Sequence, residues 1–345
     1  MIKVGVIGAT GYAGSELVRL IHGHPEAALE MIAARSHIGA PYGHVFENFK
    51  HLGECMCEED LDAMAERCDV IMMALPHGLS GGKVNKELLA KVKVVDLGAD
   101  FRLNDAAVYE HWYGAHENKE LLKEAVYGLT EIHRENIAKA RLVANPGCYT
   151  TCSILALYPL LKEGVLEPES IIIDAKSGVS GAGRGLDLGT HFCETNETIK
   201  AYKIASHRHT PEIEEQLSAA AGEKLNLIFT PHLIPMNRGI LATCYAKPRG
   251  KPAEEELQEI YRKYYENEYF IRLCKQGVFP ETKWVKGSNF CDIAVTIDER
   301  TSTVIVISAI DNLGKGAAGQ AVQNMNLLFG LDEKTGLDNV PPFPI

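Results

Sequence analysis

The chain has 345 residues, of which 46% are hydrophobic, and its 46 acidic and 35 basic side chains give a formal net charge of -11. This length predicts about two domains, and no cluster of Lys and Arg suggests a nucleic-acid surface. No apolar run reaches the roughly 20 residues that a membrane span needs. The sequence starts at once with a strand-like run that leaves no room for a signal peptide, and its nine cysteines are irregularly spaced. We therefore expect a cytoplasmic protein without a disulfide framework.

A glycine-rich turn follows the first predicted strand, Lys3 to Ile7. It carries Gly8, Gly11 and Gly14 and leads into a helix from Ser15 to Ile21. Such a turn lets a pyrophosphate approach the N-terminus of the helix closely. The spacing is GxxGxxG rather than GxGxxG, and a plain strand-to-helix turn is the alternative.

Arg35 and Ser36 follow the second predicted strand, Leu29 to Ala34. An NAD site usually presents an acidic residue here, which binds the ribose 2′-hydroxyl. A cation beside a hydroxyl suits a 2′-phosphate instead, so the sequence favours NADP over NAD. A surface arginine is the alternative.

The third and fourth predicted strands, Cys68 to Leu75 and Val92 to Leu97, each lead into a segment that could bind a ligand. Pro76 and His77 follow the carboxyl end of a strand, where open α/β sheets bind ligands; His77 could also be an ordinary turn residue. Arg102 could clamp an anion or form a salt bridge with a neighbouring acid. Alternating strands and helices up to about residue 147 predict a doubly wound sheet.

Cys148 follows a predicted strand end and the turn Asn145-Pro146-Gly147, and it begins a predicted helix from Cys148 to Leu161. The unpaired N–H groups and the dipole at a helix N-terminus stabilise negative charge, and the thiolate is the nucleophilic form of cysteine. We therefore interpret Cys148 as a candidate nucleophile, with a buried, inert cysteine as the alternative. Cys55 and Cys57 lack a second pair of ligands at metal-binding spacing, so we expect no metal site.

Two segments after this helix carry further polar groups. The predicted strand Ile171 to Ser177 leads into the loop Gly178 to Arg184, whose glycine-rich backbone and flanking cations suit a phosphate; a mobile linker is the alternative. His209 precedes a helix with Thr210 as its predicted N-cap, and this helix ends at Ala221. That position keeps an imidazole neutral and able to accept a proton, whereas a capping or solvated histidine is the alternative.

The rest of the sequence is dominated by strand-like runs with one helix, Glu254 to Asn267. This pattern predicts an α+β domain with a mainly antiparallel sheet. A helix from Gln320 to Phe329, headed by small residues, is expected to return to the first domain. We thus predict a Rossmann-type domain over residues 1–147, completed by a helix at about 316–330, and a catalytic and oligomerisation domain over 148–315. The predicted strands of the second domain include Asn226–Ile234, Ile240–Ala246, Asn289–Asp298 and Thr301–Ile310.

Four motifs follow one another along the chain: the glycine-rich turn, Asn145-Pro-Gly-Cys148-Tyr, Ser177-Gly-Val-Ser-Gly-Ala-Gly183 and His207-Arg-His209-Thr-Pro-Glu212. Together with Asn312-Leu-Gly-Lys-Gly316 they resemble the N-acetyl-gamma-glutamyl-phosphate reductase family, which is related to aspartate-semialdehyde dehydrogenase. The resemblance extends over nearly the whole chain. One departure, Thr150-Thr-Cys152 in place of smaller residues, does not touch the nucleophile.

The resemblance implies that NADPH reduces a small acyl phosphate, N-acetyl-gamma-glutamyl phosphate, to N-acetylglutamate 5-semialdehyde in arginine biosynthesis. It also implies a thioester on Cys148, with His209 or else His207 as acid/base and Glu212 as an orienting carboxylate. The family suggests a homodimer or homotetramer. The residues expected at the cofactor are Gly8, Thr10, Gly11, Tyr12, Ala13, Gly14, Arg35, Ser36, Pro76, His77, Ser177, Gly178 and Asn312. The residues expected at the substrate are Arg102, Asn145, Ser177, Gly181 and Arg184.

Two other functions fit part of this pattern. Aspartate-semialdehyde dehydrogenase shares the cofactor turn and the thioester chemistry, but the His-Arg-His-Thr-Pro-Glu segment favours the acetylglutamyl enzyme. A non-catalytic NADP-sensing protein would need neither the nucleophile nor the histidine pair, so the complete set of motifs argues against it.

Overall fold

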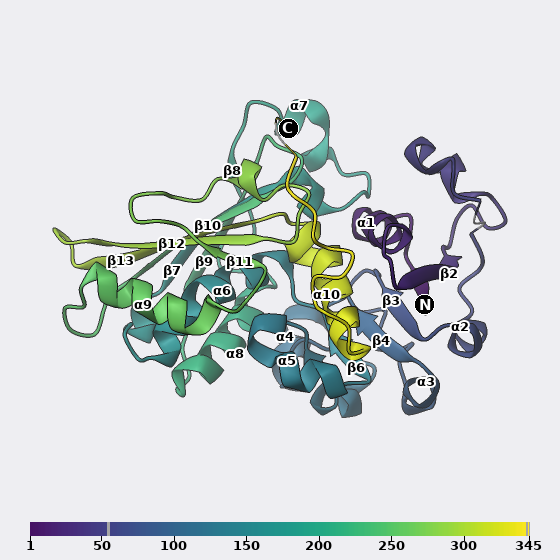
Figure 1. Cartoon of the computed structure of the whole chain (residues 1–345), viewed down its shortest axis with the longest axis horizontal. Coiled ribbons are helices and arrows are strands. Elements are labelled where there is room, and N and C mark those ends of the chain that lie inside the picture. Colours follow the sequence, from purple (N-terminus) through teal and green to yellow (C-terminus); the bar gives the residue numbers. More distant parts are fainter. Residues whose placement is uncertain (54–55, 343, 345) are drawn as a thin grey trace. The chain divides into compact units, whose positions relative to one another are not determined.

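The computed structural model describes residues 1–53, 56–342 and 344, which form two compact units; Figure 1 labels most of their helices and strands. Unit 1 comprises Met1–Pro146 and Ala317–Asp338, and unit 2 comprises Gly147–Gly316 with the tail that begins at Asn339. Cys55, which the sequence analysis considered as a metal ligand, lies outside the described residues. Among the described residues, no helix combines the length and the apolar character that a membrane span requires.

Unit 1 is built from alternating strands and helices. Their bounds are β1 Ile2–Ile7, α1 Tyr12–His22, β2 Ala27–Ala33, α2 Leu61–Arg67, β3 Val70–Met73, α3 Lys86–Lys91, β4 Lys93–Asp96, α4 Ala106–Tyr113, β5 Val126–Tyr127, α5 Thr130–Lys139, β6 Leu142–Ala144 and α10 Gly319–Leu328. The strands form a parallel sheet in the order β2-β1-β3-β4-β6-β5. The predicted doubly wound sheet is therefore confirmed.

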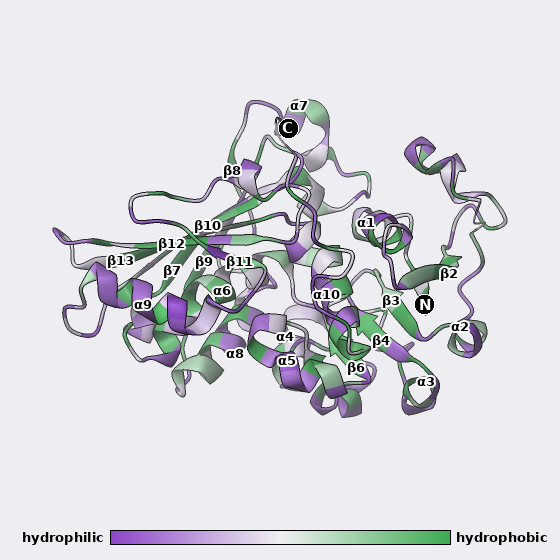
Figure 2. Ribbon diagram, in the orientation of Figure 1, coloured by the Kyte–Doolittle hydropathy of each residue, from purple (hydrophilic) through white to green (hydrophobic). Residues whose placement is uncertain are grey.

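Helices cover the sheet of unit 1 on both faces. Gly5 of β1 faces Met64 of α2, and α2 packs with α3, whereas α10 packs with α1 and α5. A parallel sheet that is covered in this way needs apolar side chains on both faces of its strands. β3 accordingly reads Val-Ile-Met-Met and is fully buried, and Figure 2 shows it as hydrophobic.

The order in which the strands are added to the sheet reverses at β1. β2 lies on one side of β1, and the next strand in the chain, β3, lies on the other side. Open α/β sheets bind ligands at the carboxyl ends of the strands that flank such a point. The glycine-rich turn follows β1 at this edge, and the loop with Pro76 and His77 follows β3. The topology thus brings two of the predicted cofactor segments to one place within unit 1.

The last helix, α10, belongs to unit 1, as predicted. It is held by buried amide side chains rather than by apolar packing alone. Asn324 donates to the carbonyl oxygen of Gly128 and to Oδ1 of Asn145, at 2.8 and 3.0 Å. Gln320 donates to Oγ1 of Thr130 at 3.0 Å. Because unpaired amides would be costly in this interior, these bonds specify where the helix packs.

Unit 2 contains a mixed sheet in the order β11-β12-β13-β10-β7-β9-β8, in which most pairings are antiparallel. The predicted α+β arrangement with a mainly antiparallel sheet is confirmed. The bounds are α6 Cys148–Lys162, β7 Ile172–Gly178, α7 Phe192–Thr195, β8 Lys200–Ala201, α8 Thr210–Ala221, β9 Ile228–Ile234, β10 Ile240–Ala246, α9 Glu254–Tyr265, β11 Ile271–Leu273, β12 Cys291–Asp298 and β13 Thr303–Ile310.

One face of this sheet is covered by helices and the other is partly exposed. Along β10, every second residue from Ile240 to Ala246 is buried, as expected for a strand with one covered face. α6 packs on β10 and β13, with α8 and α9 beside it. Since nearly all of α6 is buried, its first residue is held in place by the core of unit 2.

Candidate active site

Cys148 is the first residue of α6, directly after the N-cap Gly147, and it is half-buried. Its backbone packs tightly against Gly316, where an added Cβ would lie 2.8 Å from the Cβ of Cys148 and 3.3 Å from its Cα. Any larger residue at 316 would therefore displace the thiol. Gly316 belongs to one of the sequence motifs, but its contact with Cys148 could not be read from the sequence.

Glu212 lies in the first turn of α8, fully buried, and its side chain reaches the start of α6. Its Oε1 accepts hydrogen bonds from the backbone N–H of Gly147 at 3.0 Å and from the Thr150 hydroxyl at 2.8 Å. A carboxylate at a helix N-terminus satisfies donors that the helix itself leaves unpaired. Glu212 thus fastens the start of α8 to the helix that carries Cys148, a contact that the sequence did not indicate.

His209 and His207 lie beside the first turn of α6. The backbone N–H of His209 donates to Nδ1 of His207 at 3.1 Å, and the two ring centroids are 4.8 Å apart. The ring of Tyr149, next to Cys148 in the chain, has its centroid 5.6 Å from that of His207 and 6.0 Å from that of His209. The structure therefore brings the nucleophile helix and both histidines into one part of unit 2.

The prediction of Thr210 as the N-cap of this helix is wrong by one residue. The carbonyl of His209 already accepts the N–H of Ile213 at 3.0 Å, so His209 is the N-cap and Thr210 is the first helical residue. Pro211 fits the second helical position because its nitrogen has no hydrogen to donate.

His207 is held by an aromatic cluster that the sequence analysis did not identify. Its ring centroid lies 5.5 Å from that of Tyr202 and 5.3 Å from that of Phe229. Tyr202 donates to the hydroxyl of Tyr149 at 3.2 Å, which in turn donates to the carbonyl of His232 at 3.2 Å. His207 is buried, whereas His209 is half-buried, so the cluster fixes His207 and leaves His209 more accessible.

The loop after β7 is tied to a second loop by Asn312. Its Nδ2 donates to the Ser180 hydroxyl at 2.9 Å, and its Oδ1 accepts the N–H of Gly239 at 2.8 Å. Ser177 at the end of β7 is buried, and a Cβ added at Gly181 would lie 2.9 Å from its Oγ. Asn312, Ser177 and Gly181, all predicted site residues, therefore lie together, with Gly178 next in the chain to Ser177. Arg184 is exposed at the end of this loop.

Asp311, beside Asn312, is a buried anchor that the sequence analysis missed. Both of its carboxylate oxygens accept from Nε of Arg238, at 3.1 and 2.9 Å. They also accept the N–H groups of Gly287, Leu313 and Gly314. A fully buried carboxylate with this many charge-assisted partners fixes the backbone that leads to Gly316.

The glycine-rich turn in unit 1 has room only for glycine at two positions. Gly8 adopts φ +77°, and a Cβ there would lie 2.3 Å from the carbonyl oxygen of Ala74. A Cβ at Gly14 would lie 2.2 Å from the carbonyl oxygen of Gly8. Gly11 is the N-cap of α1 and has no side chain to cover the first N–H groups of the helix. This open helix start, which includes Thr10, Tyr12 and Ala13, fits the pyrophosphate of a dinucleotide. The fully buried Tyr42 supports the glycine-rich turn by donating a hydrogen bond to the carbonyl of Ala9 at 2.8 Å.

Besides Pro76 and His77 in the loop after β3, the other predicted residues of unit 1 lie in two places. Arg35 and Ser36 are exposed just beyond the end of β2. Arg102 is buried, and its Nε and Nη2 donate to the carbonyl oxygens of Asn145 and Leu97, each at 2.8 Å. Asn145 is also fully buried and donates to the carbonyl of Ala317 at 3.1 Å. Arg102 and Asn145 therefore lie together and hold backbone segments.

Comparison with known proteins gives a consistent answer for both units. Residues 3–140 match a family model described as semialdehyde dehydrogenase, NAD binding domain, and residues 148–312 match one described as semialdehyde dehydrogenase, dimerisation domain. Proteins named N-acetyl-gamma-glutamyl-phosphate reductase match over the full length. That of Lachnoclostridium phytofermentans is 55% identical over 346 residues, with 100% of each chain covered. Those of Desulforudis audaxviator and Campylobacter jejuni are 57% and 55% identical and cover 98% and 97% of this chain and 98% of each relative.

The chain belongs to the N-acetyl-gamma-glutamyl-phosphate reductase family. The family expected from the four sequence motifs is thereby confirmed. As a member of this family the chain is an oxidoreductase, and its NAD binding domain shows that it uses a nicotinamide cofactor.

Solved structures with the same fold include aspartate-semialdehyde dehydrogenases. Enzyme II of Vibrio cholerae, complexed with ASA, has a TM-score of 0.71 at 17% identity and covers 96% of this chain and 98% of its own. The Candida albicans enzyme with NADP has a TM-score of 0.67 at 14% identity and covers 95% and 98%. At these identities the likeness shows that the reductase shares their fold, and no more.

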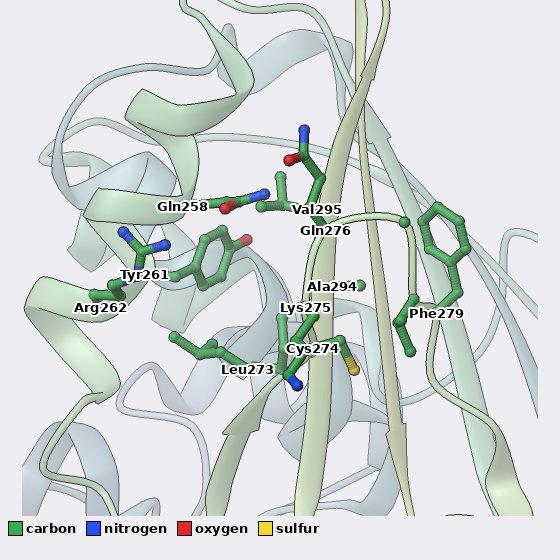
Figure 3. Close-up of a pocket in the computed structure, with 13 residues that line it drawn as sticks. Gln258, Tyr261, Arg262, Leu273, Cys274, Lys275, Gln276, Phe279, Ala294 and Val295 are labelled. Atoms are coloured by element: carbon green, nitrogen blue, oxygen red, sulfur yellow. The ribbon is translucent and has the colours of Figure 1, made fainter.

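A separate pocket of about 350 Å³ in unit 2 of the reductase lies between α9 and the end of β11 (Figure 3). Tyr261 and Arg262 of α9 line it on one side, and Lys275 and Phe279 line it after β11. The predicted site residues are not among its lining residues. It is therefore distinct from the group around Cys148.

The buried Asp96, at the end of β4, makes the stability of the reductase depend on pH. Burial raises its pKa from 3.8 to about 6; hydrogen bonds from Ser80 and Gly98 oppose this rise, and the neighbouring Asp100 adds to it. At a pH between 3.8 and about 6, the Asp96 carboxyl keeps its proton in the folded protein but releases it in the unfolded chain. The contribution of Asp96 to the free energy of unfolding therefore falls by about 3 kcal/mol as pH rises through this window.

Replacing this carboxyl tests that dependence. Asp96→Asn keeps an acceptor for Ser80 and Gly98 but stays neutral, so its stability relative to wild type should increase by about 2–3 kcal/mol between pH 4 and pH 7. Urea unfolding at the two pH values measures this difference, and Asp62→Asn, at an exposed position of α2, is the matched control. A difference that does not change with pH would contradict the assignment.

Proposed function

We propose that this chain reduces N-acetyl-gamma-glutamyl phosphate with NADPH to N-acetylglutamate 5-semialdehyde and phosphate, in the arginine pathway of the cytoplasm. The observation that carries the proposal is the arrangement at the start of α6. There the helix that begins with the half-buried Cys148 contacts two histidines through the ring of Tyr149 and a buried carboxylate through the N–H of Gly147, in a chain of this reductase family.

The first step is attack by the Cys148 thiolate on the acyl carbon of the substrate. A C–S bond forms, and the bond breaks between the acyl carbon and the oxygen that links it to phosphorus. Inorganic phosphate leaves with the bonding electrons, and a thioester remains. The first turn of α6 favours the thiolate through its N–H groups. Glu212 and Gly316 hold that turn in position, the one by hydrogen bonds and the other by close packing.

In the second step the thioester becomes an aldehyde. NADPH, when bound, supplies the hydride that reduces the thioester carbon. His209 donates its proton to the carbonyl oxygen as the hydride arrives and takes that proton back as the C–S bond breaks, which leaves the aldehyde and returns the thiolate to Cys148. His207 fixes the backbone of His209 by accepting its N–H, so we assign acid/base catalysis to His209 and a positioning role to His207.

We assign the substrate phosphate to the loop after β7. Ser177, the backbone around Gly181 and the exposed Arg184 offer hydroxyl, N–H and guanidinium donors, which together suit a phosphate. Arg102 donates to the carbonyl oxygens of Asn145 and Leu97, and Asn145 donates to that of Ala317, so in this scheme both residues act by holding the backbone.

The reverse reaction tests the proposal directly. NADP reduction is measured with N-acetylglutamate 5-semialdehyde and phosphate, and in parallel with aspartate semialdehyde. We expect turnover that requires phosphate and prefers the acetylated substrate. A preference for aspartate semialdehyde, or no reduction with either, would contradict the proposed substrate.

We further propose that Arg35 selects NADPH by binding its 2′-phosphate. It is exposed two residues beyond β2 and beside the Ser36 hydroxyl. Arg35→Asp should weaken NADPH binding by about 10- to 100-fold, as expected for loss of a charge-assisted bond, and should weaken NADH binding much less. Titration with both cofactors measures this, with the exposed Arg300→Asp as control; an equal effect on both would remove Arg35 from the site.

We propose a homo-oligomer that pairs through the partly exposed face of the sheet in unit 2. Apolar side chains such as Ile172 and Ile228, 42% and 59% exposed, lie on this face. The matched dimerisation domain, residues 148–312, includes the whole sheet. Light scattering of the purified protein would give the mass of a dimer or tetramer, and a monomer would contradict this assignment.

A further inference from the structure

The loop after β3 presents an exposed tip on a buried support. Pro76, His77 and Gly78 are exposed at the carboxyl end of a central strand, and Gly78 adopts φ +85°. An exposed loop of this kind has few apolar contacts of its own, so its conformation depends on what holds its backbone.

Asp100 holds this backbone at two points. Its Oδ1 accepts the N–H of Gly78 at 2.6 Å, and its Oδ2 accepts the N–H of Gly81 at 2.9 Å. The side chain is almost completely buried, at 1% exposure. Hydrogen bonds from backbone N–H groups to an ionised carboxylate are stronger than those between neutral groups. One buried carboxylate thus clamps both sides of the turn that follows His77.

Helix α4 supports the carboxylate and the histidine together. Tyr109 donates its hydroxyl to Oδ1 of Asp100 at 2.8 Å and stacks on Tyr113, with ring centroids 4.9 Å apart and planes at 14°. The ring of Tyr113 meets the ring of His77 edge-on, with centroids 5.6 Å apart. His116 adds a hydrogen bond of 2.5 Å from Nε2 to the carbonyl oxygen of Asp100. The clamp and the stack therefore fix both the backbone of the loop and its exposed imidazole.

We propose that Asp100, backed by the Tyr109–Tyr113 stack, is a positioning residue for the nicotinamide cofactor. The loop it clamps lies beside the glycine-rich turn, since the backbone of Ala74 touches Gly8, and both flank the ligand-binding edge of the sheet. This inference rests on the proposed function, in which that edge of unit 1 binds NADPH. It assigns to Asp100 a role in cofactor affinity, and no role in the transfer of protons or hydride.

Asp100→Asn tests the clamp, because an asparagine can accept on only one side and must leave Gly78 or Gly81 without its acceptor. We expect the Kd for NADPH, measured by cofactor fluorescence, to rise roughly tenfold. The kcat at saturating NADPH and the rate at which iodoacetamide labels Cys148 should change less than about twofold.

Tyr109→Phe removes one bond to Asp100 but keeps the ring, so it should also raise the Kd for NADPH, but by less than Asp100→Asn does. Glu87→Gln, exposed on α3, is the matched control and should leave Kd unchanged.

Several outcomes would overturn the inference. One is an unchanged Kd for NADPH in Asp100→Asn. Another is a parallel loss of kcat, of the rate of Cys148 labelling and of thermal stability in this variant, which would indicate that Asp100 acts in folding alone. If Asp100→Asn does not fold, Tyr109→Phe and Tyr113→Leu decide the question, since unchanged affinity in both would contradict the clamp. Loss of the phosphate-dependent reaction in wild type with cofactor binding intact would contradict the proposed function and not this inference.

Discussion

Cys148→Ser should lose roughly 10⁴-fold or more of the kcat for reduction of the acyl phosphate, while NADPH binding stays as in wild type. The serine hydroxyl is not ionised near neutral pH, so the start of α6 would present no nucleophile for the acyl carbon. Steady-state kinetics and cofactor titration measure the two quantities. Cofactor binding should survive because the glycine-rich turn belongs to unit 1 and Cys148 to unit 2.

A second thiol provides the control for this experiment. Cys193 is exposed in unit 2, and Cys193→Ser should keep wild-type turnover. If Cys148→Ser were as active as Cys193→Ser, the covalent mechanism would be excluded.

His209→Asn should lower kcat by about 10²–10⁴-fold, the usual contribution of general acid–base catalysis. It should also remove the part of the pH–rate profile that reports the titration of this group. His207→Asn should lower kcat by only about tenfold, because the buried ring acts through the backbone of His209. An equal loss in both variants, or a larger loss in His207→Asn, would reverse the assignment of the two histidines.

Features that depend on local sequence were predictable. A few neighbouring residues are enough to indicate each of three such features. These are the glycine spacing after β1, the alternation of strands and helices in unit 1 and the position of Cys148 at the start of a helix. The helix predicted from Cys148 to Leu161 is observed at Cys148–Lys162. Such patterns survive folding because backbone geometry and burial impose them directly.

Features that depend on contacts distant in sequence were not predictable. The bond from Gly147 to Glu212 spans 65 residues, and that from Arg238 to Asp311 spans 73. Nothing in the local sequence distinguishes Glu212 as a partner of α6 or Asp100 as a clamp for the loop after β3. The aromatic cluster around His207 likewise combines residues from three separate segments.

Very short elements were also missed. β8 and β11 contain two and three residues, which is too few for alternation of buried and exposed side chains to become visible. They extend the sheet of unit 2 at its two edges. The N-cap of α8 was misplaced because Thr210 has the chemistry of a cap, whereas the backbone of His209 makes the first helical hydrogen bond.

A single-turnover measurement without phosphate would detect a thioester on Cys148. Enzyme is mixed with N-acetylglutamate 5-semialdehyde and NADP, and NADPH absorbance is followed before and after phosphate is added. We expect a burst of at most one equivalent of NADPH per chain, followed by continuous turnover only when phosphate is present. Sustained turnover without phosphate, or no burst before phosphate is added, would contradict the thioester mechanism.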